Sequence, residues 1–132
     1  MPNDPTLALT CDLIRRPSVS PEDGGCQQQM AAFLEKLGFS VQHMRFDDVD
    51  NLWATLGDSG PVFAFAGHTD VVPPGSLEHW ETDPFVPEVR DGTLFGRGAA
   101  DMKGGLAAML TATKHVLTGE RRPKGTLAFL IA

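Results

Sequence analysis

The stretch Gly60-Pro-Val-Phe-Ala-Phe-Ala-Gly67, followed by His68-Thr69-Asp70, decides the fold class of this chain. Residues 61–66 form a continuous apolar run between two glycines, which predicts a central strand buried on both faces. A histidine follows the run, and a carboxylate comes two residues later. Ligands in open α/β sheets gather at the carboxyl ends of strands, so His68 stands where a functional residue is expected.

Helices and strands alternate along the rest of the chain. Apolar residues at helical spacing predict three helices, at about 5–16, 25–37 and 104–118. Gly38 is the expected left-handed stop of the second helix. Apolar segments predict further strands, at 39–46, 51–56 and 126–132. Asp91-Gly92 predicts a hairpin over 86–95. This alternation predicts an α/β layered sheet with helices on both faces.

Charge and composition exclude several classes of function. The chain has 132 residues with a net charge of −6, which does not favour binding to nucleic acid or to an anionic membrane surface. No apolar stretch approaches the ~18 residues that span a bilayer, and Met1–Pro5 does not resemble a secretion signal. Cys11 and Cys26 lack Cys-x-x-Cys spacing and are expected to be ordinary reduced thiols. We therefore expect a soluble, cytoplasmic protein.

The His68-Thr69-Asp70 tripeptide has two interpretations, of which one is metal binding. If residues 67–71 are extended, His68 and Asp70 share a face, and the carboxylate can accept a hydrogen bond from one ring nitrogen. That hydrogen bond would fix the tautomer and make the other nitrogen a better metal ligand. A loop histidine that merely bonds its neighbour is the simpler interpretation of the tripeptide on its own.

The second cluster is Gly96-Arg-Gly-Ala-Ala-Asp-Met-Lys-Gly-Gly105. It is neither a Walker loop, because Lys103 precedes Gly104 instead of Ser or Thr, nor a dinucleotide fingerprint, because Asp101 replaces the third glycine. Alone, Asp101 is best explained as the N-cap of the helix over 104–118. Together with His68 it supplies a nitrogen and a carboxylate from separate loops, which suits zinc or a similar divalent ion. A catalytic zinc needs about three ligands, so these two would not hold a metal tightly.

Three longer segments resemble the metallo-dependent M20 peptidase and deacylase family, and the resemblance covers essentially the whole chain. The segments are LIRRPSVSP (13–21), GHTDVVPPG (67–75) and DGTLFGRGAADMKG (91–104). The resemblance implies that His68 is a ligand of one metal ion and that Asp101 bridges two. It also implies that Asp70 is the catalytic aspartate that clamps the ring of His68. The implied cofactor is two divalent metal ions, zinc or alternatively cobalt, and a strained cis peptide is implied at Asp101–Met102.

Features within this resemblance favour one substrate. The residues Pro73-Pro74-Gly75, Trp80 and Asp83-Pro84-Phe85 imply hydrolysis of N-succinyl-LL-2,6-diaminopimelate to succinate and LL-2,6-diaminopimelate, in lysine and cell-wall precursor synthesis. An acetylornithine deacetylase or an aminoacylase of the same family is the alternative. A non-catalytic binding module is a more remote alternative from a different class.

The resemblance also implies that residues needed for activity lie beyond Ala132. The family's general-base glutamate, further metal ligands and a dimer-forming lid domain have no counterpart in residues 1–132. We therefore expect the chain to be the N-terminal part of a catalytic domain, without desuccinylating activity and with weak zinc binding on its own. We also expect the apolar strand at 127–131 to make the isolated chain prone to aggregation.

The other histidines and the serines carry weaker signals. His43 and His115 are expected to be solvated or core histidines, whereas a site role stays open for His79, beside Trp80. Ser18 and Ser20 lack the G-x-S-x-G context of a catalytic nucleophile.

Overall fold

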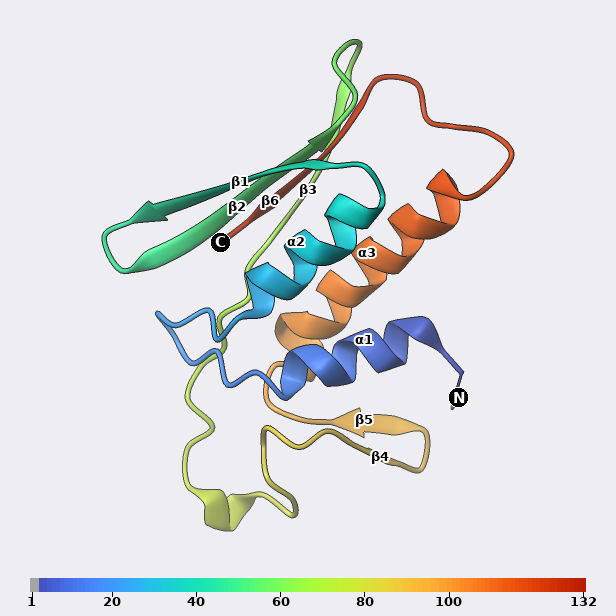
Figure 1. Cartoon of the computed structure of the whole chain (residues 1–132). Helices are drawn as coiled ribbons and strands as arrows, with labels where there is room; N and C mark the ends of the chain where they lie inside the picture. The colour runs from blue at the N-terminus through green and yellow to red at the C-terminus, as the bar shows by residue number, and fades with distance from the viewer. Residues whose placement is uncertain (1–2) are drawn as a thin grey trace.

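A four-stranded mixed sheet organises the molecule, in the strand order β1-β2-β6-β3 (Figure 1). The computed structural model describes residues 3–132. The strands of this sheet are β1 (Ser40–Phe46), β2 (Val49–Leu56), β3 (Val62–Gly67) and β6 (Thr126–Ile131). β2 pairs antiparallel with β1 and with β6, whereas β3 pairs parallel with β6. β6 therefore joins the antiparallel half of the sheet to its parallel half.

Three α-helices are present at the predicted places, with ends that differ from the predictions by at most two residues. They are α1 (Pro5–Ile14), α2 (Cys26–Lys36) and α3 (Gly104–Leu117). α1 begins after Asp4, whose carboxylate accepts hydrogen bonds from the N–H groups of Thr6 and Leu7 at 2.8 and 3.2 Å. α2 ends before Gly38, which has the predicted left-handed conformation (φ +97°).

The hydrophobic core lies between the helices and one face of the sheet. Leu52 of β2 and Ile131 of β6 face each other across the strands and are completely buried. The Phe129 ring, also completely buried, packs against Phe39 and Phe65 with centroids 5.7 and 5.1 Å apart. Burying side chains of this size contributes about 1.5–3 kcal/mol each, so this layer is the main source of stability.

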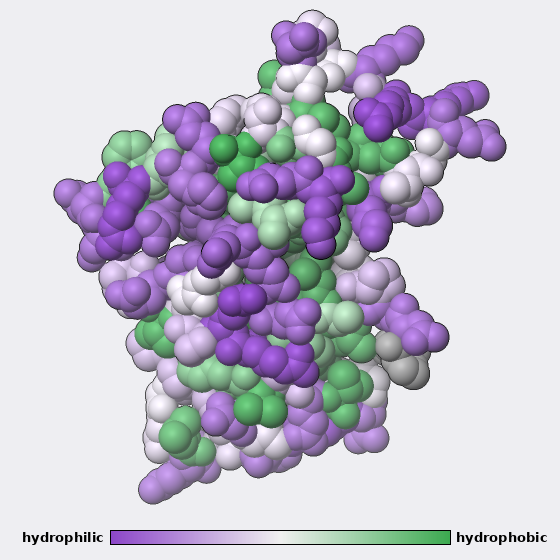
Figure 2. Space-filling model, viewed as in Figure 1, coloured by the Kyte–Doolittle hydropathy of each residue, from purple (hydrophilic) through white to green (hydrophobic). Residues whose placement is uncertain are grey.

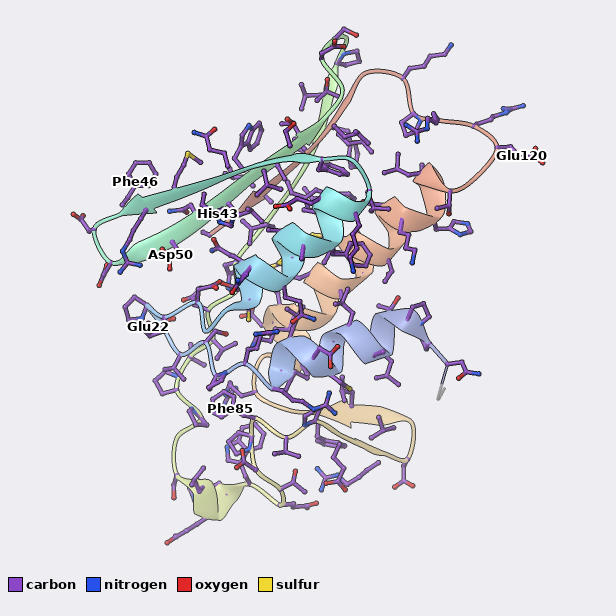
Figure 3. The ribbon with its side chains drawn as sticks, in the orientation of Figure 1. Glu22, His43, Phe46, Asp50, Phe85 and Glu120 are labelled. Atoms are coloured by element: carbon purple, nitrogen blue, oxygen red, sulfur yellow. The ribbon has the colours of Figure 1, made fainter. Side chains whose placement is uncertain are left out.

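The α/β layered class is confirmed, but the helices are distributed differently from the expectation of both faces. Within residues 3–132, α1, α2 and α3 all lie on the same side of the four-stranded sheet (Figure 1). Phe46 projects from β1 away from α2 (Figure 3) and is 63% exposed. Apolar side chains are therefore present on the face that these three helices do not cover.

The run at residues 61–66 forms a strand, as predicted, but the prediction that it is central and buried on both faces is wrong for the part of the chain described. Within residues 3–132, β3 pairs with β6 alone and lies at the edge of the sheet. Val62 and Phe63 are 59% and 60% exposed. A continuous apolar run predicts a strand that can be buried, but it does not say where in the sheet the strand lies. The equally apolar β6 takes the inner place.

The chain between β3 and α3 forms a separate region below the helices in Figure 1. β4 (Glu88–Arg90) and β5 (Thr93–Phe95) form the predicted hairpin, and Asp91 and Gly92 both have positive φ, as the tight turn requires. Leu77–His79 form one 3-10 turn. Apolar residues reach the surface in this lower part of the molecule (Figure 2), and they include Leu77 and Val86.

No helix within residues 3–132 is long and apolar enough to cross a membrane. The predicted absence of a secretion signal concerns residues 1–5, of which Met1 and Pro2 lie outside the described residues.

Candidate metal centre

His68 follows directly after β3, at the carboxyl end of the strand. The main chain just before it stays bound to the end of β6, because the Ala132 N–H donates to the Gly67 carbonyl at 2.9 Å. A side chain at Gly67 would begin 2.9 Å from atoms of Leu106 and of Met102. A larger residue at position 67 would therefore require the ends of the Leu106 and Met102 side chains to shift.

The imidazole of His68 lies between two aspartates. Nδ1 is 3.0 Å from the Asp70 carbonyl oxygen and 3.2 Å from Asp70 Oδ1, so both neighbours favour a proton on Nδ1. Nε2 then presents its lone pair and lies 3.1 Å from Oδ1 of Asp101. The contact of His68 with Asp70 that the sequence predicts is therefore present, and the Asp70 carbonyl adds a second acceptor that the sequence does not reveal.

Asp101 lies in a distorted turn between β5 and α3. Residues Ala99–Lys103 form this turn, in which Asp101 and Met102 have non-helical backbone angles (φ −131° and −138°), and the peptide between them is cis, as the family resemblance implies. The Asp101 side chain is 86% exposed. The interpretation of Asp101 as the N-cap of α3 is wrong: Lys103 occupies that position, and no side chain caps the helix. The turn separates Asp101 from the first helical N–H groups.

At Gly98 the segment that carries Asp101 packs against the segment that carries His68. Gly98 has φ +82°, and a Cβ there would lie 2.4 Å from Cγ1 of Val71. The left-handed conformation and the close approach both exclude a larger side chain.

The turn is anchored by Lys103, which is completely buried. Its Nζ donates to the carbonyl oxygens of Leu13 and Arg16, both at 2.7 Å, just where α1 ends. These two oxygens also accept main-chain hydrogen bonds, from the N–H groups of Arg16 and Ser18. Burial lowers the pKa of Lys103, and the negative end of the α1 dipole partly offsets the loss of water. Cys26 Sγ is 3.9 Å from the same Leu13 oxygen, and burial raises the pKa of its thiol.

An open cavity of about 460 Å³ places these groups around one space. Its lining consists of Ser20, His68, Asp70, Val71, Val72, Asp101 and residues 96–100. His79 is not among them, and His43 and His115 are exposed elsewhere. Within residues 3–132, no group of three or more His, Cys, Asp or Glu side chains is placed to hold a metal ion. His68 and Asp101 are thus a pair of candidate ligands, as the sequence suggested, and not a full set.

The loop between α1 and α2 also reaches the site, which sequence reasoning missed. The Ser20 hydroxyl donates to Oδ2 of Asp70. Thr69, which is 1% exposed, donates its hydroxyl to Oδ1 of Asp23 at 2.6 Å. These partners are 50 and 46 residues apart, so no local pattern in the sequence signals them.

Comparisons with known proteins show what the chain is similar to. The sequence pattern of peptidase family M20/M25/M40 matches residues 64–132, which include His68 and Asp101. A succinyl-diaminopimelate desuccinylase from Acinetobacter baylyi is 60% identical over 126 residues, which are 96% of this chain and 33% of that protein. The chain therefore spans about a third of the length of the curated relatives it matches.

Solved structures have the same fold. Human carnosine dipeptidase 1 superimposes with a TM-score of 0.84 at 26% identity, over 96% of this chain and 31% of that one. The Bacillus subtilis YXEP protein, described as a dinuclear metal binding peptidase from the M20 family, superimposes with a TM-score of 0.66 at 20% identity. That match covers 96% of this chain and 34% of YXEP.

Proposed function

Because the chain belongs to peptidase family M20/M25/M40, we propose that it forms the N-terminal part of the catalytic domain of a metal-dependent amide hydrolase. The proposed reaction is the hydrolysis of N-succinyl-LL-2,6-diaminopimelate to succinate and LL-2,6-diaminopimelate. The 60% identity with a desuccinylase over 126 residues supports this choice of substrate. The residues that complete the metal site, the general base and a dimer-forming lid domain are proposed to lie outside residues 1–132.

The distance between His68 Nε2 and Asp101 Oδ1 carries the proposal. Two ligands of one tetrahedral zinc ion, each about 2.0–2.2 Å from the metal, are about 3.3–3.6 Å apart. The two atoms are 3.1 Å apart here, both residues line the cavity, and the two acceptor oxygens beside Nδ1 favour a proton on that nitrogen, which leaves Nε2 for a metal ion. The pair therefore fits two corners of a zinc site with little adjustment.

The donor types define which metal ions fit. One imidazole nitrogen and one carboxylate, without a thiolate, suit zinc and also cobalt. The second oxygen of Asp101 is available to a second ion because that side chain is 86% exposed. The relative described as dinuclear supports a pair of ions here.

Each residue of the site then has a defined task. His68 presents Nε2 as a ligand, Asp70 holds the ring and its proton in place, and Asp101 supplies carboxylate oxygens. When bound, a pair of divalent ions lowers the pKa of water toward about 7 and polarises the amide carbonyl. The open cavity leaves the face of the site accessible to an extended amide substrate.

The proposal is tested with the protein encoded by the complete gene. We expect it to retain two divalent ions per chain and to hydrolyse the succinylated substrate faster than acetylornithine or N-acetylated amino acids. His68→Ala and Asp101→Asn should each bind less metal, as measured by elemental analysis. Each should also lower the activity at least 100-fold. His115→Ala, a change of an exposed histidine on α3, is the matched control. Faster release of acetyl groups would assign the chain to another activity of the family.

The extent of the catalytic domain is tested separately. We expect the coding sequence beyond Ala132 to encode a pair of glutamates within a few residues, and residues 1–132 alone to be inactive and to bind zinc weakly. Turnover by the isolated chain, or two zinc ions retained through dialysis, would contradict this part of the proposal. Sedimentation of the complete protein tests the proposed homodimer.

A further inference from the structure

Ser20 makes a contact that the reaction proposed above does not use. It lies in the loop between α1 and α2 and lines the cavity. Its hydroxyl donates to Oδ2 of Asp70, while Oδ1 of the same carboxylate is 3.2 Å from Nδ1 of His68. The carboxylate therefore lies between two donors, one on each oxygen.

The position of Ser20 does not depend on its hydroxyl. Val19 and Val71 form a parallel bridge. The Ser20 N–H donates to the Val71 carbonyl at 3.0 Å, and the Val71 N–H donates to the Ser18 carbonyl at 2.8 Å. The loop is thus held against the site by main-chain hydrogen bonds. Removing the side-chain oxygen should leave the loop in place.

Asp70 needs such a donor because it is poorly held otherwise. Its side chain is 40% exposed, and within residues 3–132 the two donors to its carboxylate are the Ser20 hydroxyl and the His68 ring. The other acceptor near the Ser20 hydroxyl, the Val71 carbonyl oxygen, is farther away at 3.4 Å. Without Ser20, one oxygen of Asp70 would be left to water and the carboxylate would be freer to rotate away from His68.

We propose that Ser20 is a positioning residue, which orients the Asp70 carboxylate and through it presents Nε2 of His68 to the metal ion. This inference rests on the proposed metal centre. Side chains that orient a metal-binding histidine change metal affinity or activity by about 10–100-fold when they are removed. Ser20 acts one residue further from the ligand, so the lower end of this range is expected.

The test compares four variants of the protein encoded by the complete gene. Ser20→Ala removes the donor, Ser20→Thr restores it, and Ser76→Ala is a matched control at an exposed serine without a side-chain cap bond. His68→Ala removes the ligand itself. Zinc affinity is measured by competition with a chromophoric chelator, and kcat and KM are measured with the succinylated substrate. The stability of the fold is measured as the midpoint of urea denaturation.

We expect Ser20→Ala to weaken zinc binding and to lower kcat, each by about 10-fold, with KM and the urea midpoint nearly unchanged and with recovery in Ser20→Thr. Zinc affinity of Ser20→Ala equal to that of Ser76→Ala would overturn the inference. A rise in KM without a change in zinc affinity would also overturn it, since Ser20 would then contact the substrate. A His68→Ala protein that binds zinc like the unmodified one would instead refute the proposed metal centre.

Discussion

The segments that carry His68 and Asp101 meet at one site, but different interactions hold them there. The His68–Val71 segment exchanges hydrogen bonds with the loop between α1 and α2, and part of that network is exposed. The Gly96–Lys103 segment is held by one buried ammonium group and by the close approach at Gly98. The first segment depends on many modest polar contacts, whereas the second depends on a few buried ones.

This difference matters because the energies of the two kinds of contact differ. An ordinary intramolecular hydrogen bond contributes about 0.5–1.5 kcal/mol net, but a buried polar group that loses its partner costs about 1–3 kcal/mol. Changes near Lys103 should therefore affect the stability of the whole chain. Changes around Thr69 should have smaller effects on stability.

The largest effect is expected from Lys103→Met. The change keeps most of the side-chain volume but removes two hydrogen bonds from a buried ammonium group to the carbonyl oxygens of Leu13 and Arg16, which keep only their main-chain donors. We expect the free energy of unfolding to fall by about 2–5 kcal/mol, measured by urea denaturation. Lys114→Met, at an exposed lysine of α3, is the control and should change it little. Equal midpoints for the two variants would show that the Asp101 segment does not depend on buried contacts.

Gly98→Ala tests the point where the two segments touch. The left-handed backbone and the collision with Val71 together should destabilise the protein by about 2–4 kcal/mol. Gly75→Ala separates the two causes. Gly75 also has positive φ (+77°), but apart from its chain neighbours no described residue lies within 4 Å of the place that its Cβ would take. In a Val71→Ala background the effect of Gly98→Ala should shrink. A purely additive double mutant would show that the contact is unimportant.

Thr69→Val should have a moderate effect. It removes the hydrogen bond to Asp23 from a buried position and should lower the free energy of unfolding by about 1–2 kcal/mol. Thr69→Ser keeps the hydroxyl and should recover most of this loss in the same urea experiment. A loss as large as that of Lys103→Met would mean that the two segments are held equally strongly.

The smallest effect concerns Cys26, whose sulfur lies near the Leu13 carbonyl that Lys103 binds. Burial raises the pKa of this thiol above its ordinary value of 9.0, so above pH 9 the unfolded chain loses the proton more readily than the folded one. Because the thiol proton is held more tightly in the folded chain, the stabilising effect of this group is present well below pH 9 and is lost as the pH rises through and above 9. The free energy of unfolding is measured from pH 7 to 10 for the unmodified protein and for Cys26→Ala. The difference between the two isolates the contribution of the Cys26 thiol. A difference that does not change with pH would exclude this linkage.

Local sequence patterns were sufficient to predict most of the secondary structure and the two candidate ligands. The helix ends and the Asp91-Gly92 hairpin follow from capping and turn residues, which act over a few positions. The place of β3 in the sheet could not be predicted, because it depends on which distant strand pairs with it.

The hydrogen bonds that hold the site in place could not be predicted from the sequence either. The hydroxyl of Ser20 and the ammonium group of Lys103 find their partners 50 and 90 residues away, and only the folded chain brings them together. A lysine in a glycine-rich segment also gives no sign that it is buried. The roles of His68, Asp70 and Asp101 in metal binding stay predictions until metal content is measured.

The inner position of β6 bears on the order in which the protein can fold during its synthesis. β2 and β3 both pair with β6, although about 70 residues separate the end of β2 from the start of β6. At about 5–20 residues per second, a ribosome needs about 4–14 s to make that stretch. For this period the nascent chain exposes the edges of two apolar strands with their common partner not yet made. Such a chain should rely on chaperones that shield strand edges until β6 has emerged.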